Sequence, residues 1–279
     1  MKGNVMIFAS LYLLLCWMMP VDSMAIRFNF TFRDSSPSIP LSMVEDAVDD
    51  MYFGCNEAMM NIVQERYFEV EKAAHSQALA WINAEQCANR NMKENKDKTL
   101  TKDHMHAICV YTSDDIYSTF NDAVRTQRRK YGSTFQFHSL HFLLTSAIQI
   151  LNSDNSYCHT TYRRTWAEFT GNVNQIFRFG SFSSSSYRPD LQIFGNVTCF
   201  KIKTCLGAFL KNYSSIWNEE EVLIPPYEIF KITEKLSGQG GKIEGLKDCK
   251  VIYVLEGVGM KSSLNCKIPH EYPAQLYYN

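Results

Sequence analysis

The sequence has little that could cross or anchor in a membrane. Beyond residue 25 it contains no apolar run approaching the roughly 20 residues that a spanning helix needs. Residues 269–279 also lack the hydrophobic tail of about 10–20 residues that a glycolipid-anchor signal requires. We therefore expect a mature chain with no membrane span and no glycolipid anchor.

An excess of charge of one sign is also missing. Lys and Arg number 28 against 29 Asp and Glu, which gives a formal net charge of −1. Binding to a nucleic-acid backbone depends on clustered Lys and Arg, so a nucleic-acid partner is not expected. The local basic run at residues 125–130 is more typical of a solvated helix end than of a binding patch.

Signals for a metal site are weak. The cysteines include no C-x-x-C pair, which disfavours zinc. His104 and His106 form an isolated H-x-H in a polar stretch, a pattern found more often on a surface than in a ligand pair. We expect no metal.

The first residues have the pattern of an export signal. Lys2 precedes an apolar run over residues 6–19, and small residues follow it, which predicts a signal peptide over residues 1–23 and a secreted, extracellular protein. Of nine cysteines only Cys16 would leave with this peptide, and the even number that remains indicates disulfides. Sequons at Asn29, Asn196 and Asn212 predict N-glycosylation and agree with export.

The first half of the mature chain has helical patterns. Residues 42–89 lack proline, and glycine apart from Gly54, and their apolar residues recur at helical spacing. Further helices are expected from residue 114 and over residues 140–151. The polar, lysine-rich residues 89–103 predict an exposed loop.

After residue 152 the pattern changes to short β-type runs with turn signals between them. The predicted strands cover residues 160–162, 175–179, 197–203, 221–224, 227–232 and 250–255. Helices followed by strands indicate an α+β fold instead of alternating parallel units. Because no linker divides the chain, we expect one domain over residues 24–279.

Three stretches of the β half could carry chemistry: residues 162–165, 178–186 and 219–226. Each stretch taken alone has an ordinary structural explanation. An arginine at a strand end is usually a surface cation, a serine run is usually a flexible loop, and an acidic run is usually a solvated face. The acidic run is the most informative, because it leads directly into an apolar strand. If Glu221 begins that strand, alternation places Glu219 on the same side.

Two carboxylates that face one pocket suit sugar chemistry through an oxocarbenium-like transition state. An arginine nearby could hold a phosphate through a charge-assisted, bidentate pair.

The order and the residues of the three motifs resemble those of the ecto-ADP-ribosyltransferases, which are vertebrate arginine-specific relatives of bacterial ADP-ribosylating toxins. Their signature of arginine, serine-rich strand and E-x-E is matched at residues 158–163, 178–186 and 219–230. Further similar stretches extend the resemblance over nearly all of the mature chain. It implies an enzyme that transfers ADP-ribose from NAD+ to arginine side chains of target proteins.

The resemblance also implies roles for single residues. Arg163 would bind NAD and organise the pocket, and Ser184 would support the nicotinamide ribose and the catalytic glutamate. Glu221 would be that glutamate and would stabilise positive charge as the glycosidic bond breaks. Glu219 would face the incoming guanidinium, and residues 213–217 would present the protein substrate.

The implied architecture is a helical N-terminal part beside two packed, mainly antiparallel sheets, with NAD in the cleft between them. Tyr111 and Thr112 are weaker candidates for NAD contact. No Rossmann phosphate loop is expected, so the glycine-rich residues 237–241 are interpreted as a turn. The family's usual disulfides would be Cys55–Cys266 and Cys158–Cys205, which leaves unassigned Cys87, Cys109, Cys199 and Cys249.

Two departures from the family pattern leave alternatives open. Arg164 stands where relatives usually have glycine after the motif arginine, so a bulky cation could obstruct NAD, and Arg164→Gly is expected to leave activity equal or higher. Residues 187–189 also replace a more helix-friendly continuation. The alternatives are an NAD glycohydrolase on the same scaffold and a secreted binding protein without catalysis.

Overall fold

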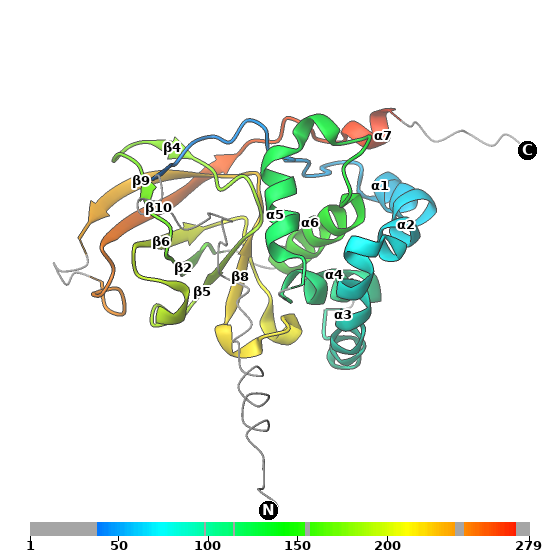
Figure 1. The fold of residues 1–279 in the computed structure, drawn as a ribbon, viewed down its shortest axis with the longest axis horizontal. Helices are drawn as coiled ribbons and strands as arrows, with labels where there is room; N and C mark the ends of the chain where they lie inside the picture. The colour runs from blue at the N-terminus through cyan, green and yellow to red at the C-terminus, as the bar shows by residue number, and fades with distance from the viewer. Residues whose placement is uncertain (1–37, 98, 114, 154–156, 238–242, 272–279) are drawn as a thin grey trace, which may run out of the picture.

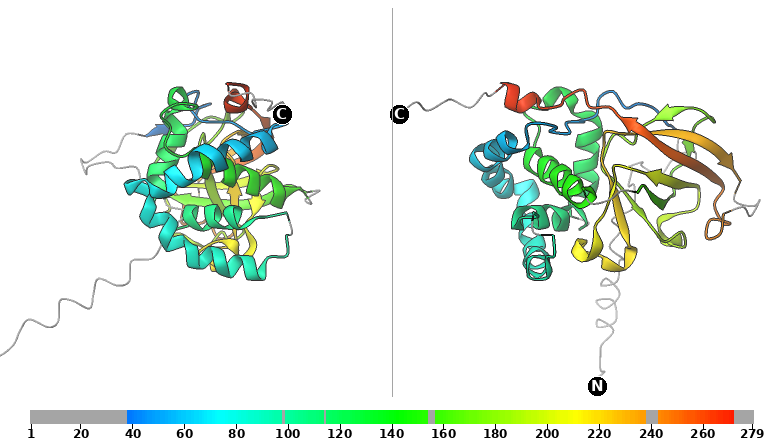
Figure 2. Two further views of the ribbon diagram at one scale, coloured as in Figure 1. Left: turned by 90° about the vertical axis from the view of Figure 1, so that its right-hand side faces the viewer. Right: turned by 180° about the vertical axis from the view of Figure 1, so that it is seen from behind.

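The computed structural model describes residues 38–97, 99–113, 115–153, 157–237 and 243–271. The predicted signal peptide over residues 1–23 and the sequon at Asn29 lie outside the described residues. Helices gather on one side of the molecule and strands on the other, as Figures 1 and 2 show. The predicted α+β class is confirmed.

The helical part is built from short and medium helices. They are α1 (Asn56–Ile62), a π-helical turn (Val63–Tyr67), α2 (Phe68–Ala73), α3 (His75–Glu94), α4 (Lys102–Tyr111), α5 (Tyr117–Thr126), α6 (His138–Asn152) and, near the C-terminus, α7 (Lys267–Glu271). The helices expected from residue 114 and over residues 140–151 correspond to α5 and α6.

The segment before α1 is irregular, so the helical prediction for residues 42–89 is wrong over residues 42–55. Val44 and Tyr52 have positive φ angles of 45° and 55°, which a right-handed helix does not allow. The carboxylate of Asp50 accepts the backbone N–H groups of Tyr52 and Cys266, each at 2.9 Å. Tertiary hydrogen bonds thus replace the helical ones that the pattern suggested.

The exposed loop predicted for residues 89–103 is wrong at both ends. Helix α3 continues to Glu94, and α4 begins at Lys102 after Thr101, whose side chain and that of His104 form a reciprocal cap. Asn91 is buried, and its amide donates to the carbonyl of Tyr213 at 2.6 Å, which compensates the loss of water. The polarity of this stretch therefore serves buried hydrogen bonds as well as solvent.

His104 and His106 are buried on α4, so the surface interpretation of this pair is wrong. The Nε2 atom of His104 lies 3.1 Å from the hydroxyl of Ser146, and His106 donates from Nε2 to the carbonyl of Trp81 at 2.6 Å. Both imidazoles connect helices. Among the described residues no group of three or more His, Cys, Asp or Glu could hold a metal ion.

The strands form an eight-stranded sheet in the order β4-β9-β10-β6-β2-β5-β8-β7 and a small sheet of β1 and β3. Their bounds are β1 (Ile39–Pro40), β2 (His159–Thr165), β3 (Phe169–Thr170), β4 (Ile176–Phe177), β5 (Ser183–Ser186), β6 (Thr198–Thr204), β7 (Ala208–Phe209), β8 (Glu221–Ile224), β9 (Glu228–Leu236) and β10 (Val251–Met260). Pairs in the large sheet are antiparallel except β10 with β6.

The large sheet narrows between β2 and β5 to the single residue pair Tyr162–Ser186. A five-stranded half and the three-stranded half β5-β8-β7 meet at this point. Phe182 and Leu223 pack in the helical core, whereas Ile224 packs with the aromatic core of the five-stranded half. Strand β8 therefore lies between two cores, and β5 is held beside it by the β5–β8 ladder.

The serine run is a buried strand and not a flexible loop. All four residues of β5 are buried, and the ladder with β8 pairs Ser183 with Ile224 and Ser186 with Glu221. Ser185 donates from its hydroxyl to the carbonyl of Val222 at 2.9 Å. Short hydroxyl side chains make such close burial possible, because each can bond to nearby backbone.

Four disulfides cross-link the described chain. They join Cys55 to Cys266, Cys87 to Cys109, Cys158 to Cys205 and Cys199 to Cys249. The first and third are the pairs that the family resemblance implied; the second joins α3 to α4, and the fourth joins β6 to the segment before β10. Such a set is typical of proteins that fold in an oxidising compartment.

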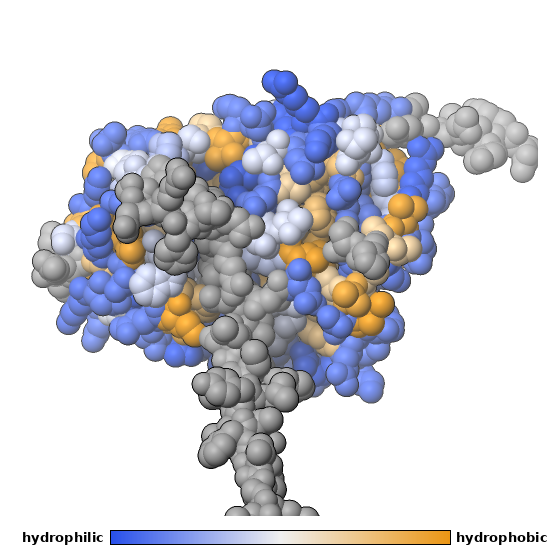
Figure 3. All heavy atoms as spheres, in the orientation of Figure 1, coloured by the Kyte–Doolittle hydropathy of each residue, from blue (hydrophilic) through white to orange (hydrophobic). Residues whose placement is uncertain are grey.

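The surface is mostly hydrophilic on the face seen in Figure 3, with apolar residues in scattered groups. Of the two described sequons, Asn212 is exposed and Asn196 partly exposed, so glycosylation at both stays a prediction. Within the described ranges, none of the helices has the length and apolar character to cross a membrane.

Candidate active site

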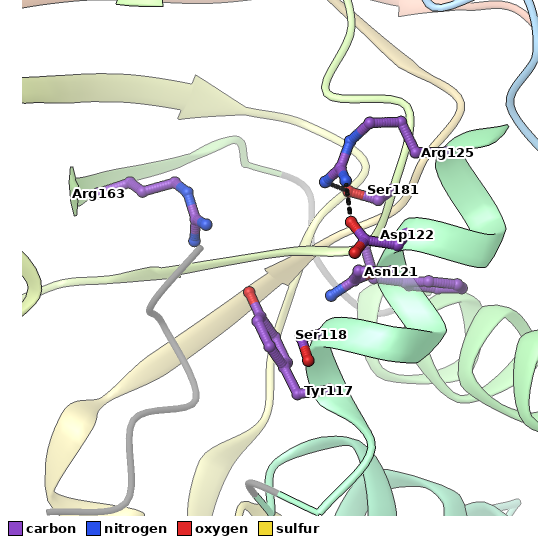
Figure 4. A pocket seen from close by; sticks show the side chains of 8 residues that line it. Tyr117, Ser118, Asn121, Asp122, Arg125, Arg163 and Ser181 are labelled. Atoms are coloured by element: carbon purple, nitrogen blue, oxygen red, sulfur yellow. Dashed lines mark hydrogen bonds and ion pairs between the residues drawn. The ribbon is translucent and has the colours of Figure 1, made fainter. Parts of the chain in front are cut away.

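Arg163 enters the site from β2. Its guanidinium is buried, and Nη1 donates to the carbonyl of Ser184 on the neighbouring strand β5. The side chain reaches a pocket between β2 and α5, where Figure 4 shows it opposite residues of that helix. Its Nε atom is buried and has no hydrogen-bond partner within the described structure.

Ser184 lies at the centre of the buried strand β5. Its hydroxyl is close to the Glu221 carboxylate and to the phenol of Tyr111; burial raises the pKa of both groups, and the Ser184 hydroxyl opposes that rise. No hydrogen bond of ordinary geometry engages the hydroxyl oxygen in the described part of the chain. The hydroxyl therefore lies between two polar side chains without the geometry of a strong hydrogen bond to either.

Glu221 is the first residue of β8, as the sequence predicts. Its Oε2 accepts a hydrogen bond from the Ser214 hydroxyl at 2.9 Å, and its Oε1 is buried without a partner among the described residues. Burial raises the pKa of the carboxyl, while the Ser184 and Ser214 hydroxyls and the Arg163 guanidinium oppose that shift.

Arg163, Ser184 and Glu221 thus each carry a buried polar atom that the described protein leaves unsatisfied. Such atoms are uncommon in folded proteins, because each costs desolvation free energy without a compensating hydrogen bond. Eight further atoms of this kind occur elsewhere among the described residues, but these three lie on the adjacent strands β2, β5 and β8, an arrangement that suits a polar ligand.

Glu219 ends a 3₁₀ turn (Trp217–Glu219) and therefore lies outside the strand. The intervening Glu220 has a left-handed backbone with φ 48°, so the strand-alternation argument does not apply. Glu219 and Glu221 are nevertheless both buried while Glu220 is exposed. A tight turn, fixed by a hydrogen bond from Ser186 to the Glu219 carbonyl, produces this arrangement.

Tyr111 and Thr112 lie at the end of α4 and are fully buried. The Tyr111 hydroxyl accepts a hydrogen bond from Asn121 at 3.3 Å, and the Thr112 hydroxyl accepts the backbone N–H of Ser215 at 2.9 Å. Neither residue lines the pocket beside Arg163. Ser184, Glu219 and Glu221 are also absent from that lining, so contact of Tyr111 and Thr112 with NAD stays a prediction.

One wall of the pocket comes from α5, which the sequence reasoning did not connect with the site. Tyr117, Asn121 and Arg125 line the pocket together with Arg163 (Figure 4). Their four-residue spacing places them on one face of the helix. Arg125 begins the basic run that was interpreted as a solvated helix end, and for this residue that interpretation is wrong.

Arg164 does not obstruct the pocket. Its guanidinium is buried away from the pocket lining, where it makes two contacts of 2.9 Å with Asp248 and donates to three backbone carbonyls. Those carbonyls belong to Pro189, Gly195 and Gly245. The steric argument that favoured Arg164→Gly is therefore wrong, because adjacent residues of a strand point to opposite faces.

The comparisons with known proteins agree with this geometry. The family model described as NAD:arginine ADP-ribosyltransferase matches residues 41–248. The erythroblast NAD(P)(+)–arginine ADP-ribosyltransferase of Gallus gallus is 32% identical over 84% of this chain and 77% of its own. Human ecto-ADP-ribosyltransferase 4 is 34% identical over 76% of this chain and 67% of its own.

Solved structures show the same relationship. The eukaryotic mono-ADP-ribosyltransferase ART2.2 superimposes with a TM-score of 0.68 at 30% identity, over 82% of this chain and 98% of its own. A mutant of ART2.2 in complex with NAD matches with a TM-score of 0.62 at the same identity and coverage. On sequence and structure alike, this chain belongs to the NAD:arginine ADP-ribosyltransferase family.

Proposed function

We propose that this chain transfers ADP-ribose from NAD+ to arginine side chains of extracellular proteins, with Arg163, Ser184 and Glu221 as the NAD-binding and catalytic residues. The observation that carries the proposal is that three buried polar motif side chains lie on the adjacent strands β2, β5 and β8, each with a polar atom that lacks a hydrogen bond of ordinary geometry. NAD offers hydroxyls and phosphate oxygens that would satisfy them.

Glu221 stabilises the developing sugar cation. When the bond between ribose C1′ and the nicotinamide nitrogen breaks, its electron pair leaves with nicotinamide, and positive charge remains on the sugar. A buried carboxylate beside that carbon is worth more than one in water, because the local dielectric is low. NAD's nicotinamide cation adds to Arg163 in favouring the ionised form of Glu221, against the burial that raises its pKa.

Glu219 acts on the acceptor. Its buried position beside Glu221 suits a guanidinium that approaches the same sugar carbon. A guanidinium nitrogen forms the new bond to C1′, and the proton that it loses passes to the Glu219 carboxylate. Water in place of guanidinium would make the same scaffold an NAD glycohydrolase.

A secreted, single-domain protein over residues 24–279 fits this activity. Relatives of this chain are named ecto-enzymes, and the four disulfides suit an oxidising environment. NAD and an arginine-bearing protein are then the two substrates, and no metal takes part.

Isotope-labelled NAD with agmatine as acceptor tests the proposal. We expect label on agmatine, together with nicotinamide release. Free ADP-ribose alone would identify a glycohydrolase. Unconsumed NAD would favour a binding protein that keeps the fold without catalysis.

A further inference from the structure

One of the sequons lies beside Glu221. The Leu210 N–H donates to the Glu221 carbonyl at 2.9 Å, and the Ser214 hydroxyl donates to the Glu221 carboxylate at 2.9 Å. Asn212 is midway along the chain between these two contacts. Because consecutive Cα atoms are about 3.8 Å apart, the Asn212 Cα lies within about 7.6 Å of the Cα atoms of Leu210 and Ser214. A group attached to Asn212 would therefore start at the rim of the site that holds Glu221.

The turn that carries Asn212 is anchored on both sides. It is the 3₁₀ turn Lys211–Tyr213, in which Tyr213 is buried. The Tyr213 carbonyl accepts the Asn91 amide at 2.6 Å, and its phenol donates to Asp97 at 2.6 Å. Lys211 forms an ion pair with Asp97 at 2.6 Å. Asn212 is exposed between these two held residues, so a group on its side chain would extend into solvent from a rigid base.

Asn212, Tyr213 and Ser214 form an N-x-S sequon, the acceptor of N-linked glycans in exported proteins. In this modification the Asn212 side-chain nitrogen bonds to C1 of the first sugar and loses one proton, and the diphosphate of a lipid-linked oligosaccharide leaves from that carbon. Ser214 is buried in the folded protein, so attachment has to precede folding. The four disulfides fit the oxidising compartment in which such a donor is available.

Asn212 is also close to Glu219, the residue proposed to act on the acceptor. The 3₁₀ turn Trp217–Glu219 packs against the turn of Asn212, and both turns lie below β8 in Figure 1. Glu219 is buried, so an acceptor guanidinium has to pass the surface to reach it. A small guanidine or an arginine on a flexible segment can do so alone, whereas an arginine on a folded surface brings that surface against the rim.

We propose that a glycan on Asn212 filters the acceptors of this enzyme: it keeps folded protein surfaces away from Glu219 and admits small guanidines and arginines on flexible segments. The inference rests on the proposed function, since it concerns which arginines receive ADP-ribose. Its physical basis is excluded volume, because a glycan is bulky and covers rim that a docking surface would otherwise contact. The pocket beside Arg163 is not lined by residues 210–219, so NAD cleavage without an acceptor should not depend on the glycan.

Acceptors that differ only in folding test the filter. Folded lysozyme presents its arginines on a rigid surface, and reduced, carboxymethylated lysozyme presents the same arginines on a flexible chain. ADP-ribose labelling of both forms and of agmatine would be measured with enzyme secreted from cells that add N-glycans. Asn212→Gln removes the glycan but keeps Ser214 and its hydrogen bond to Glu221. Asn196→Gln, at the sequon before β6, is the matched control.

Removal of the Asn212 glycan should widen the range of acceptors. For Asn212→Gln we expect labelling of folded lysozyme to rise about tenfold, within the range that docking restraints give association rates. Labelling of unfolded lysozyme and of agmatine should change by less than about twofold, because neither acceptor has to dock a rigid surface. Asn196→Gln should match wild type with all three acceptors. Enzymatic removal of glycans from the folded wild type should reproduce the result of Asn212→Gln.

The outcomes separate this inference from the proposed function. An equal ratio of folded to unfolded lysozyme labelling in wild type, Asn212→Gln and deglycosylated wild type would overturn the inference and leave the proposed function standing. Peptide mass mapping that finds Asn212 unmodified in the wild type would do the same. Loss of labelling of all acceptors in Asn212→Gln, with no rise for folded lysozyme after deglycosylation, would overturn the inference and assign the glycan a role in folding. No labelling of any acceptor by the wild type, with or without glycans, would overturn both proposals.

Discussion

Replacement of Arg164 should destabilise the protein and not improve its activity. Arg164 is 2% exposed, and its guanidinium faces Asp248 and three carbonyls on two loops, residues 187–197 and 243–250. Arg164→Gly would leave all of these acceptors without their donor and would also weaken strand β2.

The expected loss of stability in Arg164→Gly depends on how far solvent can reach the groups that the Arg164 guanidinium contacts. Removal of one member of a buried ion pair costs about 3–5 kcal/mol. The Asp248 side chain is 32% exposed, so water can solvate part of the orphaned carboxylate. We therefore expect a loss of about 2–4 kcal/mol in the free energy of unfolding, because the buried carbonyls still lose their donors. For a domain of this size that corresponds to a fall of roughly 5–15 °C in Tm.

Thermal unfolding at a fixed scan rate with intact disulfides measures this loss. NAD turnover at 20 °C, below the transition of both proteins, then separates stability from activity, and Arg164→Lys shows how much the fork contributes. An Arg164→Gly variant with unchanged Tm and tighter NAD binding would refute the reasoning and restore steric obstruction as the effect of this residue.

Two further predictions concern buried carboxyl groups. Ser214→Ala removes the hydroxyl that donates to Glu221, so the pKa of Glu221 should rise further. The acid limb of the pH–rate profile should then shift to higher pH, and the rate at neutral pH should fall about tenfold. An acid limb at the same pH in both proteins would contradict this role of Ser214. Burial raises the pKa of Glu71 from 4.5 to about 8, so the folded state keeps a proton that the unfolded chain releases, and stability should decline as pH rises from about 4.5 to 8. Urea unfolding at pH 5, 6.5 and 8 should show a smaller decline in Glu71→Gln than in wild type, whereas the exposed Glu69→Gln should match wild type; equal declines in all three would exclude Glu71 as a source.

The motif residues were predictable because their order in the chain reflects the order of strands around one site. Arg163, Ser184 and Glu221 fall on β2, β5 and β8, which are neighbours in the sheet. The strand that begins at Glu221 followed from its apolar residues and the prolines after them. The turn at Glu219 did not, because a left-handed Glu220 leaves no periodic signal.

Other parts depended on long-range contacts that a single sequence does not reveal. The irregular residues 42–55 are held by hydrogen bonds to segments far along the chain, including one from Cys266 to Asp50. Strand alternation could have predicted that the Arg164 side chain points to the opposite face of β2 from the pocket, since its neighbour Arg163 was assigned to the pocket. The place of Arg125 in the pocket lining was hidden within a basic run, and only the spacing of Tyr117, Asn121 and Arg125 on α5 could have suggested it.

The partition of products between transfer and hydrolysis tests the roles of the two glutamates most directly. Nicotinamide release and agmatine labelling would be measured on the same folded samples of wild type, Glu219→Gln and Glu221→Gln. For Glu221→Gln we expect both products to fall together by about 10²–10³, because the sugar cation loses its stabilising charge. For Glu219→Gln we expect labelling to fall much further than nicotinamide release, since only the acceptor loses its base. Full labelling by Glu219→Gln, or rapid nicotinamide release by Glu221→Gln, would contradict the account.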